Sequence, residues 1–177
     1  MRAVLDTADC LYDEAQVRAA YDALGQQISA VYAALDPLVL LVMTGGFVAG
    51  AEVLRRLRFP LQLDYLHATR YRDRTQGADV VWKHRPEKAL RGRHVLVIDD
   101  ILDEGGTLAD VRRSLAHEQP ASLRIAVLAD KQHDRRVAGA HAEFVGLKLP
   151  DRYVFGCGMD YKGYWRQLPA IYAVKGL

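Results

Sequence analysis

The stretch VLVIDDILDEGGTL, residues 95–108, contains a strand, a cluster of acids and the start of a helix. It opens with four apolar residues, a pattern typical of a strand that is buried on both faces of a parallel sheet. Asp99 and Asp100 follow directly, and Gly105 and Gly106 stand just before a threonine at the expected helix start. Because ligands of open α/β sheets bind beyond the carboxyl ends of the strands, this segment predicts a binding site.

The rest of the chain alternates between strand and helix patterns. Apolar runs predict strands at 38–43, 61–68, 94–100 and 122–130, with weaker strand signals at 79–83, 143–146 and 171–174. Helices are expected at 14–35, 47–57 and 107–117, and the polar segment 69–77 is expected to be an exposed, mobile loop. This alternation predicts an α/β fold, a parallel sheet flanked by helices with right-handed crossovers.

Composition excludes several classes of protein. The chain has 177 residues, half of them hydrophobic, and its 24 basic residues nearly balance its 22 acidic ones. That balance does not point to nucleic acid as a partner. Cys10 and Cys157 are too few for a disulfide framework, no stretch could span a membrane, and the N-terminus lacks a signal-peptide pattern. We therefore expect one cytoplasmic domain over 1–177, in which about 1–15 and 148–177 form a small hood.

The acidic segment has a physical interpretation in two halves. Gly105, Gly106 and Thr107 allow several backbone N–H groups to converge on one anion, helped by the positive end of the following helix. Asp99 and Asp100 suit the hydroxyls of a sugar, directly or through a divalent cation. A ribose 5-phosphate satisfies both halves. A capped turn with a flexible glycine link would explain the same residues, and the spacing alone does not decide between the two.

Two motifs carry a resemblance to a known family. Residues 95–108 resemble the phosphoribosyl-pyrophosphate motif of type I phosphoribosyltransferases: an apolar strand, two acids, two apolar residues, Asp, a small or polar residue, Gly, any residue and Thr. Residues 149–169, LPDRYVFGCGMDYKGYWRQLP, resemble the purine-side signature of hypoxanthine-guanine phosphoribosyltransferases, and 64–71 and 128–136 extend the match. The resemblance implies a type I phosphoribosyltransferase-like fold and a homodimer or homotetramer.

The resemblance also implies a reaction. It is purine salvage: ribose 5-phosphate passes from phosphoribosyl pyrophosphate to N9 of hypoxanthine or guanine, giving IMP or GMP and pyrophosphate, with Mg²⁺ as cofactor. Asp103 resembles the catalytic acid/base near purine N7. The residues that the resemblance assigns to phosphoribosyl pyrophosphate are Thr44, Gly45, Tyr71, Asp99, Asp100, Glu104, Gly105, Gly106, Thr107 and Arg166. The residues that it assigns to the metal are Asp99, Asp100 and Asp160.

On the purine side the resemblance assigns Lys131, Tyr153, Val154 and Asp160. A lysine can only donate hydrogen bonds, so Lys131 favours a 6-oxo group and thereby hypoxanthine or guanine over adenine. Tyr153 would stack on the base, Val154 would offer backbone groups to the ring edge, and Asp160 would hold a second Mg²⁺. Without the resemblance, Lys131 would be read as a solvated lysine and Tyr153 as a core aromatic.

The chain departs from the family pattern at several positions. Arg70 stands before Tyr71 where Ser-Tyr is usual, and Thr44 stands where many members have Lys. Glu104 and Gly106 replace Thr and Lys, and Glu104 puts a negative charge beside the expected phosphate. Two alternatives stay open: a xanthine-preferring transferase, and a regulator of the same fold that binds nucleic acid. The regulator is suggested by the basic stretch 83–93 and by the arginines of the 69–77 loop.

Overall fold

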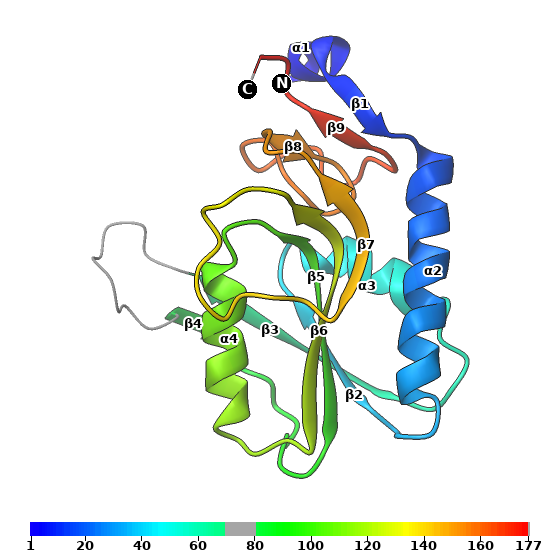
Figure 1. The fold of residues 1–177 in the computed structure, drawn as a ribbon, viewed down its shortest axis with the longest axis vertical. Coiled ribbons are helices and arrows are strands. Elements are labelled where there is room, and N and C mark those ends of the chain that lie inside the picture. The colour runs from blue at the N-terminus through cyan, green and yellow to red at the C-terminus, as the bar shows by residue number, and fades with distance from the viewer. Residues whose placement is uncertain (70–80, 177) are drawn as a thin grey trace.

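The central feature of the computed structural model, which describes residues 1–69 and 81–176, is a six-stranded sheet (Figure 1). Its strands stand in the order β4-β3-β2-β5-β6-β7. Their bounds are β2 (Leu38–Val42), β3 (Gln62–Thr69), β4 (Val81–His84), β5 (His94–Leu102), β6 (Ser122–Lys131) and β7 (Phe144–Leu149). All neighbours are parallel except β4, which pairs antiparallel with β3 at the edge. The predicted parallel α/β sheet is confirmed.

Helices cover both faces of this sheet. Helices α2 (Glu14–Tyr32) and α3 (Gly46–Leu54) lie on one face, and α4 (Gly106–Ala116) lies on the other (Figure 1). Every residue of β2 is buried, and its side chains alternate between the two faces as strand geometry requires. Val39 and Leu41 pack in the cluster that contains α2, whereas Leu40 packs in the cluster that contains α4. This two-sided burial explains why the strand is a continuous apolar run.

The two ends of the chain meet in a second, three-stranded antiparallel sheet. It contains β1 (Asp9–Tyr12), β9 (Ile171–Ala173) and β8 (Val154–Phe155), in that order, and the short helix α1 (Arg2–Thr7) precedes it. Figure 1 shows this sheet as a hood at the end of the molecule toward which β5 and β6 point. The sequence patterns predicted neither α1 nor β1 nor β8, because such short elements carry too few residues for a periodicity.

The topology places a crevice between β2 and β5. From this neighbouring pair the chain leaves in opposite directions: β2 connects through α3 to β3, and β5 connects through α4 to β6. The two helices start on opposite faces, so the connections separate at the carboxyl ends of β2 and β5. Such a switch point is where open α/β sheets bind their ligands. The residues after β2 and the residues at the end of β5 are therefore brought to one place.

The boundaries differ modestly from the expected ones. Helix α2 ends at Tyr32 rather than at residue 35, and Asp36 then turns with a positive φ of 44° before Pro37. Strand β5 continues two residues past Asp100 to Leu102, because its pairing with β6 persists as far as Leu102 and Asp130. None of the helices in the described ranges is long and apolar enough to cross a membrane.

Candidate active site

A cavity of about 1030 Å³ opens at the switch point, between the carboxyl ends of the strands and the hood. It collects residues that are far apart in the sequence. The predicted site residues that line it are Gly45, Asp99, Asp100, Asp103, Glu104, Gly105, Gly106, Thr107, Lys131, Tyr153, Val154, Asp160 and Arg166. Thr44 is not among the lining residues, although Met43 and Gly45 on either side of it are, and the Met43–Thr44 peptide is cis. Tyr71 and Arg70 lie outside the described residues.

One end of the cavity is the turn between β5 and α4. Gly105 has a φ of +80°, and a Cβ there would lie 2.5 Å from the Cβ of Ala140, so only glycine fits without displacement. Helix α4 begins at Gly106, directly beyond that turn. The first N–H groups of a helix have no partner within the helix, and they favour an anion. This end of the cavity can therefore hold a phosphate.

The carboxylate of Glu104 has a charged partner outside the turn between β5 and α4. Its side chain is 65% exposed, and Oε1 lies 3.8 Å from Nε of Arg135. Arg135 in turn donates hydrogen bonds of 2.6 and 2.8 Å to the carboxylate of Asp151. Because Arg135 is shared with Asp151, it offsets only part of the repulsion that a phosphate would meet from Glu104.

Asp99 and Asp100 stand at the end of β5 beside the turn that follows β2. Asp100 is buried, with 7% of its surface exposed, while Asp99 is partly exposed. Burial raises the pKa of both carboxyl groups, and for Asp99 the neighbouring charge of Asp100 raises it further. Two adjacent carboxylates, one buried and one partly buried, favour a cation or a set of hydroxyl donors, because either one relieves their repulsion.

Arg166 joins this acidic pair to the hood. Its Nη2 lies 2.6 Å from Oδ1 of Asp160, its Nη1 lies 3.9 Å from Oδ2 of Asp100, and it donates to the carbonyl of Gly158. The guanidinium is thereby held over the cavity with a planar fork that suits phosphate oxygens. Asp160 is engaged with this arginine and with the N–H of Gly163 at 2.7 Å.

The donor set fits a hard divalent cation, but not as a complete cage of protein ligands. Within the described ranges, no group of three or more His, Cys, Asp or Glu side chains is arranged to hold a metal ion. Mg²⁺ commonly takes only one or two carboxylates and completes its shell with water and substrate phosphates. The carboxylates of Asp99 and Asp100, which line the cavity together, meet that requirement.

Asp103 is held by two donors from one segment. Nζ of Lys131 lies 2.6 Å from Oδ2 of Asp103, and Nε2 of His133 lies 2.8 Å from Oδ1. Burial alone would raise the pKa of Asp103, but the hydrogen bonds from Lys131 and His133 outweigh it and place the pKa below its ordinary value. Asp103 is therefore a carboxylate at neutral pH, and it can accept a proton or a hydrogen bond.

His133 is a site residue that the sequence did not predict. One signal could have found it: residues two apart in an extended chain point to the same side, and Lys131 and His133 stand at that spacing. Both reach Asp103, which lies about thirty positions earlier in the chain. Nothing in the local pattern names Asp103 as their common partner.

The hood supplies the apolar wall of the cavity. Tyr153 lies just before β8, is 43% exposed and contacts Tyr161 edge-on, with 5.5 Å between the ring centroids. Val154 and Met159 line the same cavity and are buried. An exposed ring beside apolar walls gives a planar base a surface on which to stack.

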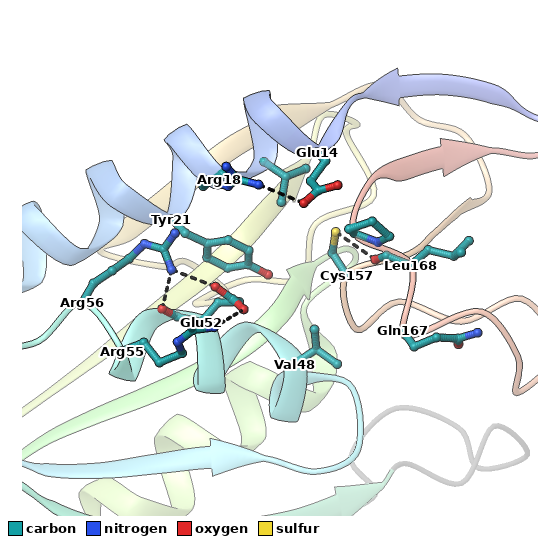
Figure 2. A pocket seen from close by; sticks show the side chains of 12 residues that line it. Glu14, Arg18, Tyr21, Val48, Glu52, Arg55, Arg56, Cys157, Gln167 and Leu168 are labelled. Atoms are coloured by element: carbon teal, nitrogen blue, oxygen red, sulfur yellow. Dashed lines mark hydrogen bonds and ion pairs between the residues drawn. The ribbon is translucent and has the colours of Figure 1, made fainter.

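A second cavity, of about 540 Å³, lies between α2, α3 and residues 167–169 (Figure 2). Its arginines are already paired with acids: Arg18 with Glu14, Arg55 with Glu52, and Arg56 with Glu52 and Asp22. Figure 2 shows the pairs of Arg18 with Glu14 and of Arg55 and Arg56 with Glu52 near the ring of Tyr21. With its charges matched internally, this cavity has no cluster of one sign to attract a charged substrate. The cavity at the switch point is the candidate active site.

Comparison with known proteins agrees with this geometry. The family model described as "Phosphoribosyl transferase domain" matches residues 7–162. The chain belongs to the phosphoribosyl transferase family. This membership confirms the family resemblance drawn from residues 95–108 and 149–169.

Individual relatives of the phosphoribosyl transferase family match along nearly the whole chain. The chain is 34% identical to a hypoxanthine phosphoribosyltransferase of Salmonella typhimurium over 168 residues, covering 93% of this chain and 94% of the relative. It is 30% identical to a hypoxanthine-guanine phosphoribosyltransferase of Streptococcus pneumoniae, covering 96% and 94%. A solved hypoxanthine-guanine-xanthine phosphoribosyltransferase superposes with a TM-score of 0.87 at 26% identity, covering 96% and 99%.

Proposed function

We propose that this protein transfers ribose 5-phosphate from phosphoribosyl pyrophosphate to N9 of hypoxanthine or guanine, which makes it a purine salvage enzyme. The observation that carries the proposal is the shared cavity. The Gly105–Thr107 cradle, the acidic pair of Asp99 and Asp100, and Tyr153 all line it. The names of the curated relatives favour the same two bases.

The sugar side of the reaction follows from the cradle and the acids. The N–H groups at the start of α4 bind the 5-phosphate, and Asp99 and Asp100 hold the ribose hydroxyls. The C1–oxygen bond to pyrophosphate breaks, and Arg166 stabilises the charge on the leaving group. When bound by Asp99 and Asp100, with Asp160 as the candidate for a second ion, Mg²⁺ would supply further neutralisation of that pyrophosphate.

The purine side of the reaction depends on Asp103 and on the side chains that line the cavity near it. Tyr153 stacks on the base, Val154 offers backbone groups to its edge, and Lys131 donates to the 6-oxo group. As N9 forms its bond to C1 of the ribose, the proton on N7 passes to the carboxylate of Asp103. Adenine, which has an amino group at position 6, would set two donors against each other at Lys131.

The base preference is tested by a spectrophotometric assay with phosphoribosyl pyrophosphate, Mg²⁺ and each of hypoxanthine, guanine, xanthine and adenine. We expect nucleotide formation with hypoxanthine, guanine or both, and none with adenine. Turnover mainly with xanthine would select the xanthine-preferring alternative. Absence of product with both hypoxanthine and guanine would contradict the proposal.

Within residues 1–69 and 81–176, the structure offers no observation that favours a nucleic-acid regulator. The basic stretch 83–93 has partners of its own: Arg85 stacks on the ring of Trp82 at 4.5 Å, and Arg93 donates to the carbonyl of Asp36. The backbone N–H of Lys88 donates to the carboxylate of Asp64, and the charge of Lys88 helps to lower the pKa of Asp64. A salt-dependent shift of RNA or DNA without nucleotide synthesis would reverse this preference.

We also propose a homodimer or homotetramer in the cytoplasm. Phe47, at the start of α3 beside the Thr44 turn, is 54% exposed and would be available for a contact with a second copy there. Cys10 and Cys157 are both free thiols, as a reducing compartment requires. Light scattering of the purified protein decides between monomer, dimer and tetramer.

A further inference from the structure

His133 is fixed in place by the segment around it. This segment follows β6, and the N–H of Gln132 donates to the carbonyl of Leu149 at 2.8 Å. Further on, the N–H of Val137 donates to the carbonyl of Glu104 at 2.9 Å, which ties the segment to the phosphate turn. Arg136 donates to the carbonyl of Lys131 at 2.8 Å. His133 therefore reaches Asp103 from a braced backbone rather than from a free loop.

The hydrogen bonds of the His133 ring assign its tautomer. The backbone N–H of Arg135 donates to Nδ1 at 3.1 Å, so Nδ1 is an acceptor and carries no hydrogen. The ring hydrogen is then on Nε2, which lies 2.8 Å from Oδ1 of Asp103 and donates to it. The side chain of His133 is only 2% exposed, whereas that of Asp103 is 43% exposed. His133 thus lies behind the carboxylate, away from solvent, and Asp103 faces the cavity.

The two oxygens of Asp103 are divided between two different kinds of donor. Oδ2 is bonded to Lys131, whose long flexible side chain lines the cavity and which we have assigned to the purine 6-oxo group. Oδ1 is bonded to His133, which is buried and is not among the residues that line the cavity. Only one of the two donors is therefore free to change partner when a base arrives.

We propose that His133 is a positioning residue for the acid/base carboxylate of Asp103, an inference that rests on the proposed function. It holds Oδ1 throughout the reaction. Lys131 turns to the 6-oxo group and leaves Oδ2 to the N7 proton. Without His133 the carboxylate would lose the donor that fixes its orientation, and it would lose part of the stabilisation of its charged form.

The charged groups around this contact are known, which makes a pH profile interpretable. Lys131 and His133 touch Asp103 directly. Arg135, paired with Asp151 and lying near Glu104, is the next charged group along the same segment. Loss of the His133 donor raises the pKa of Asp103, because the remaining effect of burial disfavours the carboxylate.

The test compares His133→Ala with His133→Gln, whose side-chain amide can still donate to Oδ1. We expect His133→Ala to lower kcat by roughly 10- to 100-fold, as misplacement of a reacting group does, with little change in KM for phosphoribosyl pyrophosphate. The acid limb of its kcat/KM profile for the base should move to higher pH. His133→Gln should recover most of kcat and return the limb toward its original position.

The chain offers a matched control in His141. This histidine is exposed, belongs to the same connection between β6 and β7, and its Nε2 lies 3.2 Å from a carboxylate oxygen of Glu143. His141→Ala should leave both kcat and the acid limb unchanged. An unmoved kcat or an unmoved acid limb in His133→Ala would overturn the inference. Equal losses of kcat and melting temperature in both His133 variants would also overturn it, because they would indicate a purely structural role.

A readout that needs no activity separates this inference from the proposed function. In the free protein, ¹⁵N NMR of the imidazole should show the hydrogen of His133 on Nε2, and the ¹³C titration of Asp103 should move to higher pH in His133→Ala. A hydrogen on Nδ1 or an unchanged Asp103 titration would contradict the inference even in an active enzyme. If the protein converts none of the tested bases but both NMR results are found, the proposed function is wrong, while the hydrogen bond from His133 to Asp103 is confirmed.

Discussion

Gly45 and Asp100 meet so closely that a Cβ on Gly45 would lie 2.1 Å from Oδ2 of Asp100. The turn after β2 and the acid at the end of β5 thus touch with no side chain between them. The contact ties together the two connections that separate at the switch point. It also fixes Asp100 in the cavity that Arg166 and Asp160 line.

Gly45→Ala should therefore damage the site more than the fold. The added methyl must push the Asp100 carboxylate away, and we expect kcat/KM for phosphoribosyl pyrophosphate to fall by roughly 5- to 150-fold, since crowding of this kind costs about 1–3 kcal/mol. The matched control is Gly50→Ala within α3, where the three atoms nearest to the methyl would be Leu41 side-chain carbons, the first at 2.4 Å. That control should lower the melting temperature while the KM values stay near those of the wild type. Equal kinetics in Gly45→Ala and the wild type would contradict the role of this contact.

The phosphate turn gives a second comparison between glycines. Gly105 and Gly139 have nearly the same φ, +80° and +81°, so alanine meets similar backbone strain at both, about 1–2 kcal/mol. Only Gly105 is crowded, by Ala140 and Leu102, and only Gly105 lines the cavity. Gly105→Ala should raise KM for phosphoribosyl pyrophosphate by roughly tenfold or more, and Gly139→Ala should not. The claim is tested by steady-state kinetics on both variants, and a similar KM in the two would sink it.

Lys131 is bonded to Asp103 and is assigned to the purine 6-oxo group, so its substitution should affect both the pKa of Asp103 and the use of the base. Lys131→Gln removes a charged donor to the 6-oxo group, so kcat/KM for hypoxanthine should fall by roughly 10- to 150-fold, equivalent to about 1.5–3 kcal/mol. The pKa of Asp103 should rise, because one of the two donors that lower it is gone. Lys148→Gln, on the exposed side of β7, is the control and should behave as the wild type. Unchanged discrimination between hypoxanthine and adenine in Lys131→Gln would refute the assignment.

Glu143 lies outside the active site, and its hydrogen bonds should make the stability of the fold depend on pH. Burial would raise its pKa, but hydrogen bonds from Arg112 and from the N–H of Ile125 lower it below the ordinary value. A carboxyl with a depressed pKa in the folded state contributes stability that is present above its unfolded pKa, about 4.3, and is lost as the pH falls through the folded pKa. Glu143→Gln should therefore reduce the free energy of unfolding by roughly 1–3 kcal/mol at pH 7. The difference between variant and wild type should shrink in urea titrations at more acidic pH, and a constant difference would be evidence against this pairing.

Much of the fold could be predicted because its central strands are buried on both faces. Such strands must be apolar along their whole length, as β2 is, and the sequence marks them clearly. The hood could not be predicted in detail, because β1 pairs with β9 from the other end of the chain and β8 has only two residues. The edge strand β4 has only four residues, and two of them are exposed, so its pattern gave only a weak signal.

The active site likewise contains one part that the sequence could predict and another that it could not. The cradle and the acids are contiguous in the sequence, so a motif could name Asp99, Asp103 and Gly105. The partners of Asp103 come from residues 128–136. The family resemblance of that segment gave Lys131 a role but gave none to His133. Likewise the pairing of Glu104 with Arg135 depends on how the connection after β6 folds back over the phosphate turn, which no local pattern encodes.

The central claim is that Asp103 exchanges the purine proton in a cavity that also binds the sugar phosphate. Its most direct test is the steady-state rate of IMP and GMP formation by Asp103→Asn across a range of pH. We predict a loss in kcat of roughly 10²- to 10⁴-fold, the usual contribution of a general acid or base, with a smaller change in KM for phosphoribosyl pyrophosphate. A variant that keeps the full kcat with both bases at every pH would contradict the account.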